Sequence, residues 1–249
     1  MFSVVWEWLT RGWQDFRRAA LLNIAYAAVF LAIGLVAVLG LHGAGFSLVY
    51  FIMAGGFLIV VPGLVTVYYH LAERLHTGQQ LGFSDIRSAF SQFPVSILII
   101  GLVSAVIYLI WVTDALIIYS VYFDFVPLSI DQFKADPALQ ADATAFLLFA
   151  CILGFVLSFI IYCVTVLSIP YALQKQASLV DAVSFSVRVV SNNPRIMFLW
   201  AILLGSLTFL TVLFALPLLL VLLPVLAYAN YAAYTDMLGL MEAKGAVVD

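Results

Sequence analysis

One carboxylate interrupts an otherwise apolar stretch of the sequence. Asp114 lies within the run IYLIWVTDALIIY, residues 107–119, and no lysine or arginine lies inside any apolar run to pair with it. An acidic side chain at membrane depth commonly serves a proton or ion pathway or a contact between helices. Three roles remain open for Asp114: an acid that reaches water at the outer interface, a contact to a partner subunit, and a proton or ion relay.

The direction of Asp114 on its helix favours contact with lipid or with a partner protein. Small and aromatic residues recur at helical spacing along one side of this segment, as expected for close helix packing. The members of this packing stripe are Gly101, Ala105, Tyr108, Val112, Ala115 and Tyr119. Asp114 lies roughly 220° round the helix from Gly101, on the side that also carries Trp111. We therefore predict that Asp114 and Trp111 contact a partner membrane protein.

A second group of residues combines aromatic rings, hydroxyls and one amide at the inner ends of apolar runs. Its members are Tyr68, Tyr69, His70, Tyr171, Tyr228, Asn230, Tyr231 and Tyr234. They could form an aromatic belt at the lipid headgroups. They could also line a polar cytoplasmic vestibule, formed where Pro62, Pro170 and Pro224 free carbonyls of the preceding helical turn. The sequence leaves both interpretations open.

The remaining reactive residues do not form a recognisable catalytic or metal site. His42 and His70 lie at opposite ends of one predicted helix, so they cannot share a haem. His70, Glu73 and His76 are spaced by three, which spreads their side chains round a helix. Serine, histidine and aspartate do not cluster, and no phosphate-binding glycine loop occurs. We expect no enzyme, no cofactor and no metal.

Composition assigns the chain to a membrane. Of its 249 residues, 65% are hydrophobic and 9% are charged, against about 25% charged in soluble domains. Six apolar stretches are long enough to cross a bilayer. They cover residues 19–41, 46–71, 95–123, 145–167, 197–216 and 217–238. The net charge of −3 and the lack of a basic run exclude a nucleic-acid partner.

The spans group into three hairpins, 19–71, 95–167 and 197–238. Each follows a short segment of amphipathic periodicity that is typical of a helix in the membrane interface. These segments are 1–18, 83–93 and 178–193. Glycine recurs in the outgoing helices and proline in the returning ones, which suggests an internal repeat. The residues proposed for helix packing or kinking are Gly34, Gly101, Gly205, Pro62, Pro170 and Pro224.

The sequence thus predicts one domain over 1–249: an all-α polytopic membrane helix bundle of six transmembrane helices, each hairpin preceded by a short amphipathic interfacial helix. Nearly every basic residue falls on one side of this arrangement, and only Lys134 falls on the other, within an acidic outer loop at 124–142. The excess of lysine and arginine marks the cytoplasmic side. Both termini, including a tail at 239–249, are expected there.

Several segments resemble a known family. They are GWQDFRRAALLNIAYAAVFLAIG (12–34), MAGGFLIVVPGLVTVYYHLAERLHTG (53–78), LSIPYAL (167–173) and VSNNPRIMFLWAILL (190–204). The chain resembles a bacterial family of six-span integral membrane proteins catalogued as a domain of unknown function, some labelled cytochrome c oxidase subunit I-like. The resemblance implies a bacterial inner-membrane location. Because the chain has three histidines in all, that label fits membership of a respiratory-type complex better than catalysis.

Two functions follow from these observations. The first is a non-catalytic accessory or assembly subunit, embedded in the lipid bilayer, that docks another membrane protein complex through Asp114 and Trp111. The alternative is a small-solute or lipid transporter built from three hairpin repeats, with proline-broken helices lining a polar cavity.

Overall fold

The computed structural model describes residues 1–44, 57, 61, 64–124, 126, 132 and 135–243. Within these residues the chain is helical and contains no strand. Five of the described helices are long and apolar enough to cross a membrane. They are α2 (Ala20–Gly43), α6 (Val95–Phe123), α8 (Pro137–Thr165), α11 (Pro194–Phe214) and α12 (Leu219–Ala243). The chain is therefore an all-α polytopic helix bundle, as predicted.

The predicted second span, 46–71, falls mostly outside the described residues, and so does Pro62. The described helix at its inner end is α4 (Thr66–His76). The predicted fourth span starts earlier than expected, because α8 begins at Pro137. The Asp136 carboxylate accepts a hydrogen bond from the Ala138 backbone N–H at 2.9 Å, and proline is favoured in the first helical turn. Asp142, predicted in the outer loop, therefore lies within α8.

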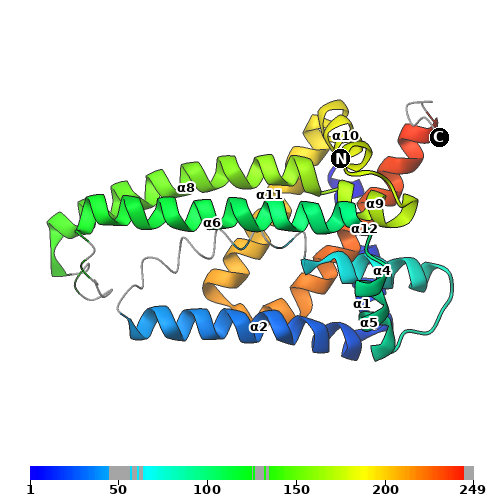
Figure 1. Ribbon diagram of the computed structural model, residues 1–249, viewed down its shortest axis with the longest axis horizontal. Coiled ribbons are helices and arrows are strands. Elements are labelled where there is room, and N and C mark those ends of the chain that lie inside the picture. The colour runs from blue at the N-terminus through cyan, green and yellow to red at the C-terminus, as the bar shows by residue number, and fades with distance from the viewer. Residues whose placement is uncertain are drawn as a thin grey trace.

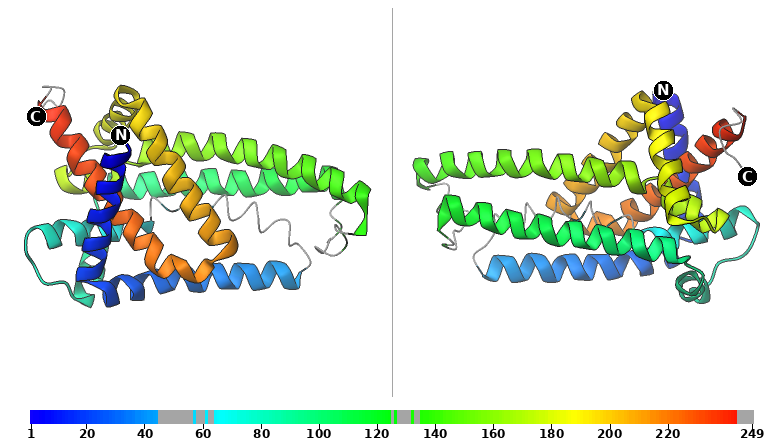
Figure 2. Two further views of the ribbon diagram at one scale, coloured as in Figure 1. Left: turned by 180° about the vertical axis from the view of Figure 1, so that it is seen from behind. Right: turned by 45° about the horizontal axis from the view of Figure 1, so that its top comes forward.

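Five short helices gather at one end of the long ones, as Figure 1 and Figure 2 show. We call them the platform, and we use 'inner' for the platform end of the bundle and 'outer' for the opposite end. They are α1 (Phe2–Arg18), α4, α5 (Phe83–Ser91), α9 (Ser168–Lys175) and α10 (Leu179–Asn192). The amphipathic segments expected at 1–18, 83–93 and 178–193 correspond to α1, α5 and α10. The last turns of α12 lie at the same end, so the beginning and the end of the described chain share one side of the bundle.

Helix α1 has two apolar faces with different surroundings. Val5, Trp8 and Gly12 are buried against the bundle, whereas Phe2 and Trp6 are 73% and 71% exposed. A Cβ atom at Gly12 would lie 2.5 Å from the backbone oxygen of Val225 in α12, so the two helices touch at backbone distance. The exposed aromatic face suits a membrane interface, where such rings accumulate.

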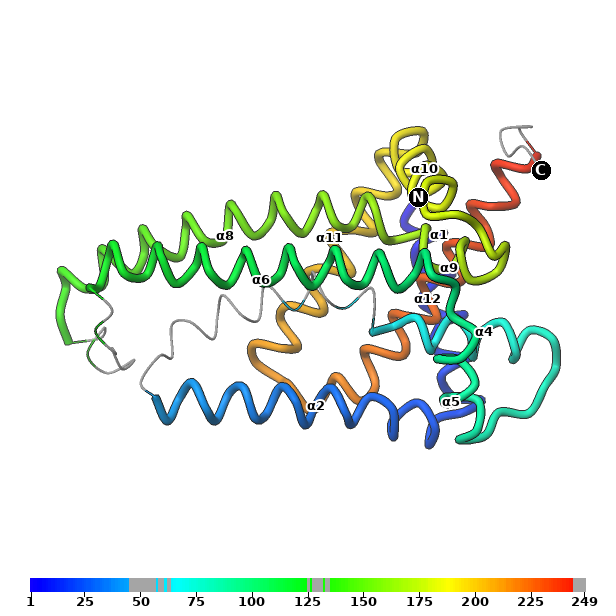
Figure 3. Tube along the Cα trace, in the orientation of Figure 1, coloured from blue at the N-terminus to red at the C-terminus, as the bar shows by residue number. Residues whose placement is uncertain are grey.

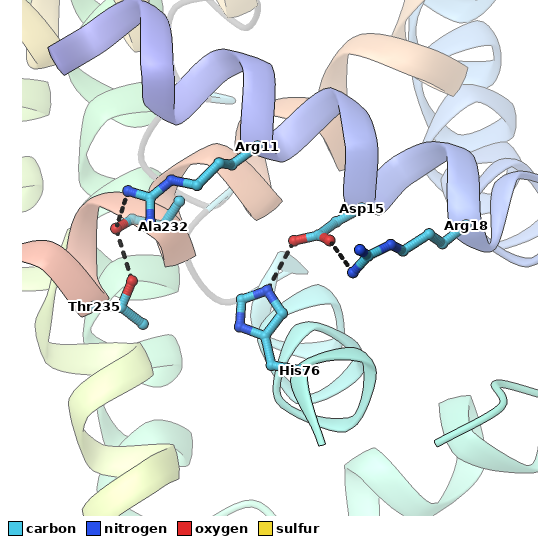
Figure 4. Close-up of polar contacts among 6 residues, drawn as sticks. All are labelled: Arg11, Asp15, Arg18, His76, Ala232 and Thr235. Carbon is cyan, nitrogen blue, oxygen red and sulfur yellow. Dashed lines mark hydrogen bonds and ion pairs between the residues drawn. The ribbon is translucent and has the colours of Figure 1, made fainter. Parts of the chain in front are cut away.

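Polar contacts fix α1 across α12 and α4. The Trp8 indole N–H donates to the Asp236 carboxylate at 2.8 Å, and Arg11 forms an ion pair with the same carboxylate. Figure 4 also shows the last turns of α1, where the Asp15 carboxylate accepts a hydrogen bond from Arg18 at 3.1 Å and lies 3.0 Å from the His76 imidazole. These contacts connect α1 with both α12 and α4.

Helices α6 and α8 run side by side as the longest pair (Figure 3), and their outer halves form a core of their own. Trp111 is central to it: the side chain is 3% exposed, and a Cβ at Gly154 of α8 would lie 2.9 Å from its ring. The assignment of Trp111 to an outward side is therefore wrong. None of the described residues lies within 4 Å of a Cβ added at Gly101, so the placement of Gly101 in the packing stripe is also wrong.

The sequence interpretation misplaces Trp111 because it takes Gly101 as the reference point for the packing face of α6. Buried or half-buried positions along α6 follow steps of three and four, through Ser104, Tyr108, Trp111 and Ala115. Gly101 is not part of this contact, since a Cβ added there meets none of the described residues within 4 Å. An angle measured from Gly101 therefore misplaces the residues of the contact. Ala115 and Tyr119 of the predicted stripe are buried, while Ala105 is exposed.

Helices α11 and α12 form a tilted hairpin that joins at the short helix η1 (Leu216–Leu218). Figure 2 shows this hairpin as a V whose tip lies beside α2. A Cβ at Gly34 of α2 would lie 3.2 Å from the Leu216 side chain. Gly34 is therefore a close-packing position. An added Cβ at Gly205 of α11 would meet no atom of the described part of the chain within 4 Å, so the packing role predicted for Gly205 is wrong.

Candidate functional site

A buried amide holds together the inner ends of four helices. Asn230 of α12 is 4% exposed. Its Nδ2 group donates to the Tyr69 hydroxyl at 2.9 Å and to the Val166 carbonyl at 2.7 Å, and its Oδ1 accepts from the Trp200 indole N–H at 2.9 Å. These partners belong to α4, to the α8–α9 junction and to α11. We call these four residues the Asn230 knot.

Pro170 leaves free the backbone carbonyl that Asn230 binds. Helix α8 ends at Thr165 and α9 begins at Ser168, with Pro170 in its first turns. Proline has no N–H, so the carbonyl four residues earlier, that of Val166, loses its normal helical donor. Asn230 supplies the replacement at 2.7 Å. Pro170 therefore acts as a helix break with a freed carbonyl. Pro224 lies inside α12, six residues before Asn230.

A second amide lies next to this knot. Asn23 of α2 is fully buried, and its Oδ1 accepts from the Tyr228 hydroxyl at 2.8 Å. The Tyr68 hydroxyl donates to the Asn23 backbone carbonyl at 3.1 Å. The Asn23 amide nitrogen donates to the Phe16 carbonyl of α1 at 3.1 Å. These bonds connect the platform with α2 and α12.

The other members of the predicted aromatic group take structural positions. The Tyr234 hydroxyl donates to Gln174, and the Tyr171 ring stacks on Phe185 with centroids 4.2 Å apart. His70 is buried, and its Nε2 has no hydrogen-bond partner within the described part of the chain. All members except Tyr171 are buried. The group is therefore an interior polar layer, whereas a headgroup belt would leave the rings at the surface.

One cavity touches this layer. Its volume is about 640 Å³, within the range of about 300–1,000 Å³ that small-molecule sites occupy. Tyr69 and Asn230 line its inner end, and Trp111 and Leu147 line its outer end. From Leu147 to Thr165 the wall of α8 runs about 27 Å at 1.5 Å per residue. The cavity is thus an elongated space that follows the direction of the spanning helices.

The cavity opens sideways between α8 and α11. At the inner end these helices touch, because the Tyr162 hydroxyl donates to the Met197 carbonyl at 2.7 Å and the Phe159 and Phe198 rings meet edge to face. Further outward α11 leaves α8 towards α2, as Figure 2 shows. Phe155 and Ile202, which line the cavity from the two helices, are 57% and 46% exposed. In a bilayer this side faces the hydrocarbon.

The lining is apolar and uncharged. None of the described residues that line the cavity is an aspartate, glutamate, lysine, arginine or histidine. Charged residues lie instead in the platform, where burial raises the pKa of the Glu73 carboxyl. No group of three or more potential metal ligands occurs among the described residues. The site is therefore suited to an apolar molecule with at most a small polar end.

Asp114 and Trp111 do not act together at this site. Trp111 is a wall of the cavity, and Asp114 is half-buried on α6 and is not part of the lining. The sequence interpretation also missed several residues: Trp200 and Val166 of the knot, the buried Asn23, and Gly154. Asn23 and Asn230 carry a recognisable signal, because an amide inside an apolar run needs internal partners.

The family comparison agrees with these membrane features. The family model described as "Predicted integral membrane protein (DUF2189)" matches residues 49–174, half of the chain. This range contains Tyr69, Pro170 and Val166 of the site. No curated protein and no solved structure matches the chain. With multiple spanning helices and a family model that covers half of its length, the chain belongs to the DUF2189 family of predicted integral membrane proteins.

Proposed function

We propose that this protein takes up a long apolar molecule from the bilayer and carries it in the cavity between α8, α11 and α12, as a lipid transporter. The observation that supports this proposal is the uncharged cavity of about 640 Å³, which lies inside the spanning bundle and opens towards the hydrocarbon. The role requires binding and release of the molecule and no bond-making chemistry.

One of the observations that favoured the accessory-subunit role does not hold in the structure. That role relied on an outward side of α6 formed by Asp114 and Trp111, whereas Trp111 packs on Gly154 within the same chain. Apolar residues on the outer faces of spanning helices contact lipid in any membrane protein. The cavity therefore favours the transporter over the docking subunit.

The proposed orientation places the platform in the cytoplasmic leaflet of a bacterial inner membrane. Arg17, Arg18, Arg87 and Arg188 all lie on platform helices, and the cytoplasmic side carries the excess of lysine and arginine. Both α1 and the end of α12 are then cytoplasmic. The lateral opening faces the middle part of the bilayer.

A pair of glycine substitutions tests the proposed function. Gly205 lines the cavity and Gly101 does not, yet a Cβ at either position meets none of the described residues within 4 Å. Gly205→Leu therefore places a side chain in the cavity, and Gly101→Leu adds the same side chain elsewhere on a spanning helix. A diacylglycerol with brominated chain ends is titrated into nanodiscs of phosphatidylcholine. The difference in quenching between each protein and its Trp111→Phe version isolates the signal of the buried Trp111 from that of the other four tryptophans.

We expect saturable quenching in the wild type, about tenfold weaker binding in Gly205→Leu, since its side chain occupies the ligand's space, and no change in Gly101→Leu. Equal saturable quenching in all three proteins would overturn the proposal. So would a wild-type response that rises linearly with the brominated lipid, because that result describes collisions with bulk lipid only.

A further inference from the structure

We infer that the ligand of this cavity is an uncharged long-chain molecule whose polar end is a carbonyl group, bound by the Tyr69 hydroxyl. The inference rests on the proposed function and names its substrate class. It depends on where the Tyr69 hydroxyl proton points, which follows from the hydrogen bonds of the Asn230 knot.

The orientation of the Asn230 amide is fixed by its neighbours. Val166 offers a carbonyl oxygen, which can only accept, and the Trp200 indole N–H can only donate. The amide must therefore present Nδ2 to Val166 and Oδ1 to Trp200. A flipped amide would place two acceptors together and two donors together. The second Nδ2 proton then points to the Tyr69 oxygen at 2.9 Å.

In this arrangement the Tyr69 hydroxyl oxygen accepts a hydrogen bond from Asn230. The hydroxyl proton of Tyr69 therefore needs an acceptor outside the knot. Among the described residues the only hydrogen bond of the Tyr69 hydroxyl is the one it accepts from Asn230. The side chain is 4% exposed, so water from the platform side does not reach it freely. A buried O–H without an acceptor costs free energy. Tyr69 lines the cavity, where a ligand can provide that acceptor.

The Tyr69 ring has little freedom to turn away. It stacks on Tyr231 with ring centroids 6.3 Å apart and an interplanar angle of 27°. The neighbouring hydroxyl of Thr165 is already used, because it donates to the Ile161 carbonyl of its own helix at 2.8 Å. At the inner end of the cavity, Tyr69 is therefore the group that offers a proton to a ligand.

The chemistry of the lining favours an uncharged acceptor that brings no proton of its own, and a carbonyl is such an acceptor. An ionised headgroup would lose its hydration in a cavity whose described lining has no counter-charge. An alcohol would accept the Tyr69 proton but bring another O–H that needs an acceptor. A ketone or ester carbonyl accepts and adds no proton. The length of the wall, about 27 Å along α8, suits a long chain, since the bilayer hydrocarbon is about 30 Å thick.

The test compares three ligands of equal chain length: a long-chain ketone, the corresponding secondary alcohol and the corresponding hydrocarbon. Each competes with the brominated diacylglycerol in nanodiscs of phosphatidylcholine. The proteins are the wild type, Tyr69→Phe and the control Tyr26→Phe. Tyr26 donates to the Leu64 carbonyl at 3.0 Å and does not line the cavity. Infrared spectra of the bound ketone report on its carbonyl directly.

In the wild type we expect the ketone to bind about tenfold more tightly than the hydrocarbon, with the alcohol between them, as one buried hydrogen bond predicts. Tyr69→Phe should remove this preference, leave hydrocarbon affinity unchanged and shift the carbonyl band back to higher frequency. Tyr26→Phe should behave as wild type. Unchanged hydrocarbon binding shows that the variant is folded.

The outcomes separate the two proposals. The inference about Tyr69 is wrong if Tyr69→Phe still binds the ketone more tightly than the hydrocarbon and the carbonyl band of the bound ketone has the wild-type frequency. In that case, ligand binding that is still weakened by Gly205→Leu leaves the proposed function in place. If neither the brominated lipid nor any of the three competitors binds the wild type saturably, both proposals are overturned.

Discussion

At the scale of single residues, Asn230 has the largest structural role in the described chain. One side chain satisfies a proline-freed carbonyl, an indole N–H and a phenol oxygen from three other elements. Membrane helices gain little from apolar contact alone, since lipid is equally apolar, so buried hydrogen bonds have a large share in positioning them. The knot sets both the inner wall of the cavity and the direction of the Tyr69 proton.

Asn230→Leu should destabilise the protein by about 2 kcal/mol, because it leaves the Trp200 N–H and the Val166 carbonyl buried without partners. Unfolding by SDS in mixed micelles, followed by circular dichroism, measures this change. Asn192→Ala, at the exposed end of α10, should change stability by less than about 0.5 kcal/mol. Equal stability of Asn230→Leu and wild type would contradict a structural role for the knot.

Residue-level features were only partly predictable from sequence. Asn230, Tyr69 and Pro170 stand out because polar groups and proline are conspicuous in apolar helices. Their partners do not stand out: Trp200 is 30 positions from Asn230 and Val166 contributes a backbone carbonyl. Such pairs depend on how whole helices cross, which local patterns do not encode.

At the scale of elements, α1 belongs to the bundle as well as to the interface. Its close approach to α12 depends on Gly12, where an added Cβ would lie 2.5 Å from the Val225 oxygen and 2.7 Å from the Ala229 nitrogen. Composition and periodicity predicted the helices and the amphipathic nature of α1. They did not predict that Val5, Trp8 and Gly12 form a second buried face, because glycine contacts have no hydrophobic signal.

Gly12→Ala should lower the free energy of unfolding by about 1–3 kcal/mol, since two of the three clashing atoms are backbone, the third is the Ala229 Cβ, and none can move aside cheaply. Gly239→Ala is the matched control in α12, where an added Cβ meets none of the residues that the structure describes within 4 Å. It should be neutral or stabilising by up to about 1 kcal/mol from helix propensity. The same SDS titration compares the two, and a neutral Gly12→Ala would show that α1 is not held at this distance.

At the scale of the whole molecule, the third hairpin differs from a simple spanning pair. Its tip packs on Gly34, nine residues before α2 ends at Gly43, or about 14 Å along the helix. The tip sequence ALPL, residues 215–218, has no polar residue. We therefore expect the tip to lie within the hydrocarbon. The V shape of this hairpin also opens the space that becomes the cavity (Figure 2).

Cysteine labelling tests this depth in a protein whose Cys151 and Cys163 are replaced by alanine. Ala44→Cys, just past the end of α2, should react with a membrane-impermeant maleimide added from the outer side. Leu218→Cys should stay unlabelled from either side, although Leu218 is 51% exposed, because lipid covers it. Rapid labelling of Leu218→Cys would place the tip in water and contradict the tilt of the hairpin.

The most direct test of the account is photo-crosslinking inside the membrane. A long-chain ketone with a diazirine near its carbonyl is incorporated into nanodiscs with the wild-type protein and illuminated, and its adducts are mapped by mass spectrometry. We predict adducts on Tyr69, Asn230 and Thr165, which line the cavity and are each at most 4% exposed. Adducts confined to outward residues such as Leu98 and Leu102 would contradict the account.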